Sequence, residues 1–104
     1  MIRPFFVLSA ILSLAAAGGY AQSSGEATYK AKCLVCHGAA GLADTGVGVA
    51  WKIKPVTSPA VKTFTEAAMI DATKNGMGKM QAFKDKLTDA EIRSSVAYFR
   101  TLIK

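Results

Sequence analysis

Cys33-Leu34-Val35-Cys36-His37 is a C-x-x-C-H stretch that holds both cysteines and the single histidine of the chain. In an exported protein this pattern is typical of the attachment site of a c-type haem, where two thiols add across the two vinyl groups of the porphyrin. Residues three apart share one face of a helical turn, so both thiols can meet one edge of the macrocycle. The next residue, His37, then turns its imidazole toward the iron. The stretch therefore predicts haem c, held covalently through Cys33 and Cys36, with His37 as an axial ligand.

The same two cysteines are compatible with a structural disulfide, a thioredoxin-like dithiol or half of a zinc site. Zinc would need a second pair of ligands, and the chain has no other cysteine or histidine. A redox dithiol follows a β-strand at the start of a helix, and no strand pattern precedes Cys33. Haem attachment is the interpretation that these residues favour.

Residues 1–21 have the features of a secretory signal peptide. Arg3 supplies a positive start, residues 5–17 form an apolar run, and Gly19 and Ala21 place small residues where a signal peptidase reads them. An uncleaved anchor and a buried helix are the alternatives, but the run is short for a membrane span, which needs about 20 residues. We expect cleavage after Ala21, export to the periplasm, and no stable membrane insertion afterwards.

The remaining residues, 22–104, are one small domain, near the size at which an apolar core alone is marginal. A buried haem would supply the missing apolar contact area. The chain has 13 basic and 7 acidic residues and a formal net charge of +6. This balance favours acidic partners or anionic surfaces. Nucleic acid is not expected as a partner, because no basic cluster is interleaved with exposed aromatic residues.

Local patterns predict three helices and no strand. The first runs over residues 25–36 with Ser24 as N-cap. The second is opened by a capping box of Thr63 and Glu66 and ends at residues 75–76. The third follows a second capping box, Thr88 to Glu91, and carries an apolar stripe through residues 92, 96, 99 and 103.

Between the first two helices, residues 38–59 are rich in glycine and contain two prolines. A loop of this length is unusual in a compact domain unless it has a function, and wrapping over a haem is such a function. Its one large side chain is Trp51. Trp51 either fills the core or packs near the haem with its indole N–H directed to a propionate.

The order of these segments resembles the class I (small, soluble, mono-haem) cytochromes c. The resemblance covers residues 24–104 and rests on three stretches: 33–38 (CLVCHG), 75–83 (NGMGKMQAF) and 87–92 (LTDAEI) leading to 97–99 (AYF). It implies an all-α cytochrome c fold, with three main helices and long loops wrapped around one covalently attached haem. It also implies that Gly25 and Tyr29 lie on the face of the first helix that crosses the last helix near Tyr98.

By the same resemblance, Met80 matches the distal axial methionine, so that His37 and Met80 are the two iron ligands. A thioether ligand raises the reduction potential. Met77 and Met69 are rivals for this position, and Met69 has the pattern of a core residue in a helix.

Two departures from the family matter. Gln81 follows the methionine where the family usually has proline, and this loosens the turn. Many relatives also have a loop proline whose carbonyl accepts the ring N–H of the proximal histidine. Gly46 and Val47 stand in the corresponding region, so the acceptor for His37 is not identified.

The resulting hypothesis is a periplasmic one-electron carrier, not an enzyme, because two strong axial ligands leave the iron no open position. A haem peroxidase or gas-binding sensor with a labile methionine is the first alternative, but the chain lacks a second histidine to act as a distal acid or base. The second alternative is a haem subunit of a larger oxidase or dehydrogenase.

Five lysines lie in segments expected around the haem crevice: Lys52, Lys54, Lys79, Lys84 and Lys86. They predict a surface that attracts redox partners with acidic docking faces, although each lysine alone is equally consistent with solubilising charge.

Overall fold

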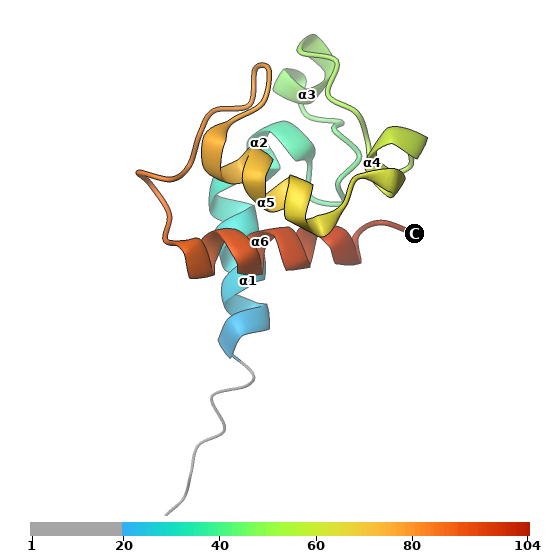
Figure 1. Ribbon diagram of the computed structural model, residues 1–104. Coiled ribbons are helices and arrows are strands. Elements are labelled where there is room, and N and C mark those ends of the chain that lie inside the picture. Colours follow the sequence, from blue (N-terminus) through green and yellow to red (C-terminus); the bar gives the residue numbers. More distant parts are fainter. Residues whose placement is uncertain (1–19) are drawn as a thin grey trace, which may run out of the picture.

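We describe the fold from a computed structural model in which the described residues are 20–104 (Figure 1). Residues 1–19, which hold most of the expected leader, lie outside them. The signal peptide and its cleavage after Ala21 therefore stay predictions. No helix within residues 20–104 is long and apolar enough to cross a membrane.

The described chain forms six helices and, within these residues, no strand beyond an isolated bridge between Met77 and Met80. The predicted all-α fold with three main helices is confirmed. The helices are α1 (Tyr20–Lys32), α2 (Leu34–His37), α3 (Gly46–Ala50), α4 (Pro59–Thr63), α5 (Glu66–Asn75) and α6 (Asp89–Thr101).

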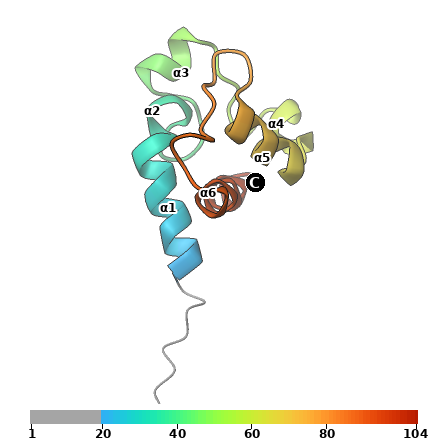
Figure 2. The same cartoon turned by 60° about the vertical axis from the view of Figure 1, so that its left-hand side comes forward.

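Helices α1 and α6 cross in direct contact, and the two views of Figures 1 and 2 agree on this crossing. Gly25 allows it, because a Cβ at this position would overlap the backbone carbonyl of Ser94. One turn later, the ring of Tyr29 packs against Tyr98 with centroids 5.2 Å apart. The predicted contact of Gly25 and Tyr29 with the last helix near Tyr98 is confirmed.

A compact apolar cluster joins α6 to the segment that precedes it. Phe83, Leu87 and Ile92 are buried together, and Ile70 from α5 and Met80 pack against them. The backbone N–H of Phe83 also donates to the carbonyl of Thr73 at 2.9 Å. The segment that carries Met80 is thereby attached to α5 at its base.

The N-terminus of α6 has the predicted capping box. The Thr88 hydroxyl accepts from the backbone N–H of Glu91 at 3.1 Å, and the Glu91 carboxylate accepts from the N–H of Thr88 at 3.0 Å. Gly76 ends α5 with φ +85°, as predicted from its freedom to adopt this conformation.

Two predicted helix starts are wrong. Ser24 lies inside α1, because the helix already begins at Tyr20. Thr63 ends the short α4 and caps nothing, because Ser58 and Pro59 start a separate helical turn ahead of it. Thr65, two residues later, is the N-cap of α5 and accepts from the N–H of Ala68. In both cases a polar residue near a helix start was one of several possible caps.

Candidate haem site

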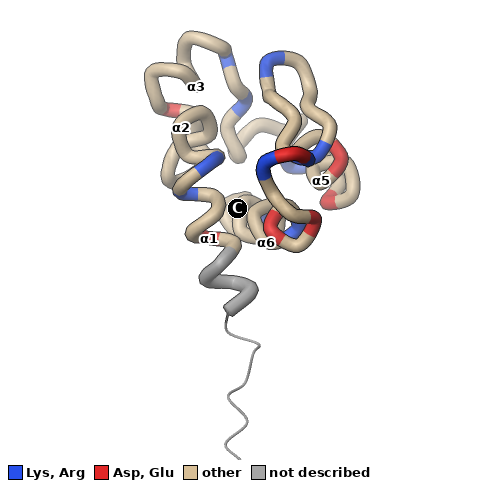
Figure 3. Tube along the Cα trace, turned by 90° about the vertical axis from the view of Figure 1, so that its left-hand side faces the viewer, with Lys and Arg blue, Asp and Glu red and all other residues tan. Residues whose placement is uncertain are grey.

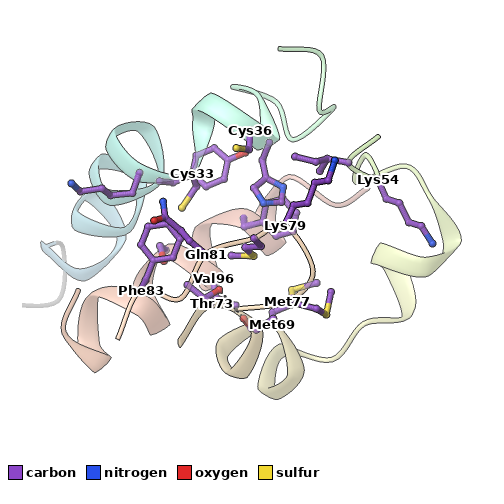
Figure 4. A pocket seen from close by; sticks show the side chains of 18 of the residues that line it. Cys33, Cys36, Lys54, Met69, Thr73, Met77, Lys79, Gln81, Phe83 and Val96 are labelled. Carbon is purple, nitrogen blue, oxygen red and sulfur yellow. Dashed lines mark hydrogen bonds between the residues drawn. The ribbon is translucent and has the colours of Figure 1, made fainter. Parts of the chain in front are cut away.

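A cavity of about 1000 Å³ is lined by residues of all six helices and of the segment 77–83 (Figure 4). Its volume is at the upper end of the range for cofactor sites in proteins. Most of its lining is apolar, including Val47, Val61 and Phe99. The cavity brings together all four residues predicted to hold a haem: Cys33, Cys36, His37 and Met80.

Cys33 follows the end of α1 and Cys36 lies in α2, and both are free thiols. The backbone N–H of Cys36 donates to the carbonyl of Cys33 at 3.2 Å, which holds the two residues in one helical turn. Burial, and secondarily the neighbouring Cys36, raises the pKa of Cys33 to about 11. A redox dithiol needs a thiol with a lowered pKa, so this environment disfavours a thioredoxin-like role.

A zinc site is not supported either. Within residues 20–104, no group of three or more histidine, cysteine, aspartate or glutamate side chains lies close enough to hold a metal ion. The two thiols and the imidazole of the C-x-x-C-H stretch are themselves not gathered into such a group. The donors on the cavity wall are instead thioethers.

His37 ends α2 with its ring edge against Phe99, at a centroid distance of 5.2 Å. Its Nδ1 is buried and has no hydrogen-bond partner among the described residues. Burial lowers the pKa of His37, so the imidazole is neutral and keeps a lone pair for a metal. Nδ1 is thus the ring nitrogen that lacks a hydrogen-bond partner, while the ring lines the cavity and can offer its other nitrogen to a bound group. The acceptor for its N–H remains unassigned.

The haem motif is held from outside by two hydroxyl groups. Tyr29, in α1, donates from its Oη to the carbonyl of Gly38 at 2.6 Å. Thr45 donates from Oγ1 to the carbonyl of Val35 at 2.7 Å and accepts from the N–H of Gly48 at 3.0 Å. Thr45 is thus both the N-cap of α3 and a clamp on α2.

Sequence reasoning missed Thr45 and α3. A sequence signal for this helix exists, because threonine is a favoured N-cap residue and Thr45 directly precedes the first residue of α3. The glycine content of residues 38–59 concealed it, since glycine normally argues against a helix. Here Gly48 is required, because a Cβ there would overlap the carbonyls of Ala43 and Cys36.

Three methionines line the cavity. Met80 is half-buried against the Phe83 cluster, whereas Met77 is 59% exposed at the edge of the cavity. Met69 is buried in α5, and its sulfur lies 3.8 Å from the guanidinium of Arg100. The choice of Met80 as ligand remains a prediction that this arrangement allows.

Trp51 does not fill the core. Trp51 is 45% exposed and lines the cavity. The Nζ of Lys79 lies 5.7 Å from the centroid of the indole ring. Trp51 directly follows α3, while Lys79 belongs to the turn between Met77 and Met80. This cation–π contact therefore joins the two sides of the cavity.

In the backbone tube of Figure 3, Lys and Arg positions (blue) lie on the segment beside α3 and on the loop near α5. Lys54 and Lys79 line the cavity. The Nζ of Lys86 lies 5.9 Å from the ring centroid of Phe83, and Lys52 and Lys84 are exposed. Among the described side chains, only Lys30 and Lys74 form ion pairs, with Glu26 and Asp89 respectively.

Comparison with known proteins agrees with this geometry. Residues 21–99 match the family model described as "Cytochrome C oxidase, cbb3-type, subunit III". The solved structure of a protein named KustC0563 c-type cytochrome superimposes with a TM-score of 0.68 at 28% sequence identity, covering 77% of this chain and 98% of that one. No curated protein matches the chain.

Proposed function

Because the chain belongs to the family of cytochrome c domains described as cbb3-type cytochrome c oxidase subunit III, we propose that it carries single electrons in the periplasm. A small c-type cytochrome is an electron-transfer protein and not an enzyme. The observation that carries the proposal is the cavity in which Cys33, Cys36, His37 and Met80 meet.

In this proposal Cys33 and Cys36 hold one haem c through two thioether bonds, and His37 and Met80 are its axial ligands. When bound, the haem supplies an iron that gains and loses one electron. His37 is suited to its role because burial lowers the pKa of its imidazole and so favours the neutral form, and Met80 because its side chain packs against the core cluster. If His37 and Met80 both hold the iron, the group would transfer electrons without binding a substrate.

The protein environment supports electron transfer in a second way. The cavity is lined mainly by apolar side chains, which keep water from the bound group, yet Trp51, Met77 and Lys79 at its edge are exposed. A partner can therefore approach the cofactor closely from this side. The lysines around the cavity would steer an acidic docking face toward it, with an association rate that falls as salt rises.

A second candidate is a haem subunit held in a larger oxidase. The description of the family model favours it, and so do the exposed apolar residues that line the cavity: Val35 in α2, Trp51 and Met77. Gel filtration of the protein extracted from its native host distinguishes a free carrier from a subunit. A free carrier elutes at the size of a single small domain, and a subunit elutes with a complex.

The test of the main proposal is an absorption spectrum of the exported protein, oxidised and then reduced, together with its mass. We expect a mass increased by one haem and decreased by the leader, a ferric far-red band from the iron–thioether bond, and little change with cyanide or carbon monoxide. A high-spin spectrum with ready ligand binding would instead support a peroxidase or gas sensor. A chain without covalent haem would refute the proposal.

A further inference from the structure

Met77 and Met80 face each other across a tight turn. The backbone N–H of Met77 donates to the carbonyl of Met80 at 3.0 Å, and the N–H of Met80 donates back to Met77 at 2.9 Å. Gly78, with φ +57°, allows the two-residue turn between them. Directly opposed residues of an antiparallel pair project from the same face, with Cβ atoms about 5 Å apart. Both thioethers are therefore presented on one side, and both line the haem cavity.

The two side chains differ in how they are held. Met80 is half-buried on the cluster of Phe83, Leu87 and Ile92, whereas Met77 is exposed and has no such support. Met80 is thus positioned as the resident ligand. A methionine side chain is long, unbranched and flexible, so Met77 has the reach to replace it without unfolding of the turn.

Few contacts outside the turn hold its tip: beyond the Met77–Met80 backbone pair, its side-chain partners are Trp51 for Lys79 and, just after Met80, Lys86 for Gln81. Its base is attached to α5 by hydrogen bonds from Phe83 to Thr73 and from Lys84 to Lys74. Gln81 stands directly after Met80, so the turn lacks a proline that would restrict its backbone. At the tip, the contact of Lys79 with Trp51 is a single exposed cation–π pair, which is a weak interaction.

We propose that Met77 is a second thioether ligand of the haem iron, which takes the distal position when Met80 leaves it. In the exchange the bond from Met80 Sδ to iron breaks and the bond from Met77 Sδ forms, with no proton moved and no change in oxidation state. The inference rests on the proposed ligation by His37 and Met80. It goes beyond that proposal because the turn would then carry two thioether sulfurs, from Met77 and Met80, that can each bind the same side of the iron.

Met69 is not the second donor, although it also lines the cavity. Its side chain is buried in α5, and its sulfur lies beside the guanidinium of Arg100. Lys79 is the other rival, since it lines the cavity from within the same turn. Its amine would give a nitrogen ligand, which has no far-red thioether band.

The test compares Met80→Leu, Met77→Leu and the double variant, each loaded with haem in the export host. Leucine keeps the volume and apolar character of methionine. We expect the ferric far-red band in both single variants and its loss in the double variant. Cyanide should bind readily only to the double variant. Met80→Ala gives the same readout if the leucine variant does not load haem.

A loss of the band in Met80→Leu, with the band present in the unsubstituted protein, overturns the inference and leaves the proposed function standing. A second outcome is a low-spin spectrum of Met80→Leu that lacks the far-red band and becomes high-spin when Lys79 is also changed to Gln. This outcome assigns the replacement ligand to the Lys79 amine and also overturns the inference. Absence of the band from the unsubstituted protein refutes the His37–Met80 pair itself, and the inference with it.

Discussion

At the scale of single residues, the Tyr29 hydroxyl connects α1 to the turn that follows the haem motif. Burial raises the pKa of Tyr29, so the hydroxyl remains protonated and donates to the Gly38 carbonyl. Tyr29→Phe removes the donor and leaves that carbonyl unsatisfied, at a cost of about 1–3 kcal/mol. We expect this loss in urea unfolding of the haem-loaded protein. Tyr98→Phe is the matched control, because its hydroxyl does not bond to Gly38. Equal losses in the two variants would contradict the assignment.

Thr45 acts at the same scale on the other side of the motif. Thr45→Val keeps the shape of the side chain but removes the bonds to the Val35 carbonyl and the Gly48 N–H. We expect a loss of about 1–2 kcal/mol in unfolding free energy, since an N-cap and a clamp are lost together. Thr45→Ser retains the hydroxyl and should retain most of the stability. If serine is as harmful as valine, packing of the methyl group and not hydrogen bonding matters here.

At the scale of helices, the crossing of α1 and α6 depends on the absence of a side chain at residue 25. Gly25→Ala places a Cβ on the Ser94 backbone, and the helices must separate. Overpacking of this kind costs about 1–3 kcal/mol. Gly46→Ala, where a Cβ meets nothing within 4 Å, is the control. Thermal unfolding should show a lower Tm for Gly25→Ala alone, and a Tm lowered to the same extent by both would argue against the crossing.

The capping box of α6 predicts a pH dependence. Hydrogen bonds from Thr88 hold the pKa of Glu91 below its ordinary value. A carboxylate with a lowered folded-state pKa stabilises the fold above its unfolded pKa, which is about 4.3 for glutamate, and this contribution is lost as the pH falls from there through the lower folded-state pKa. The stability difference between the unsubstituted protein and Glu91→Gln should therefore be largest at neutral pH and shrink below pH 4. A difference that stays constant from pH 7 to 3 would exclude this carboxylate as the cause.

At the scale of the whole molecule, the cavity makes the fold depend on its cofactor. An apolar space of about 1000 Å³ is large for a chain of 104 residues, and a group that binds only the folded state stabilises it. We expect a chain with both cysteines changed to alanine, exported without haem, to lose near-UV circular dichroism and to bind a hydrophobic dye. Native-like sharp unfolding of that variant would show that the protein part forms its core alone.

The sequence predicted the molecule best where a contact joins neighbouring residues. The capping box of Thr88 and Glu91 and the end of α5 at Gly76 were both correct. It failed where several polar residues could serve as the same N-cap, as with Thr63 and Thr65 before α5. Only the direction of the preceding chain decides which hydroxyl accepts from the first backbone N–H groups of the helix. The glycines of residues 46–48 were misleading for a related reason, since packing against Cys36 overrides their poor helix propensity.

The sequence by itself therefore determined the haem motif, the all-α class and the main helices, because spacing along a helix is a local property. Only the tertiary structure decided how the cavity is built. It placed Trp51 at the edge and not in the core, set Met80 on the core cluster with Met77 outside it, and brought Tyr29 and Thr45 onto the haem motif. These arrangements depend on contacts between separate segments of the chain, and such contacts leave no fixed spacing in the sequence.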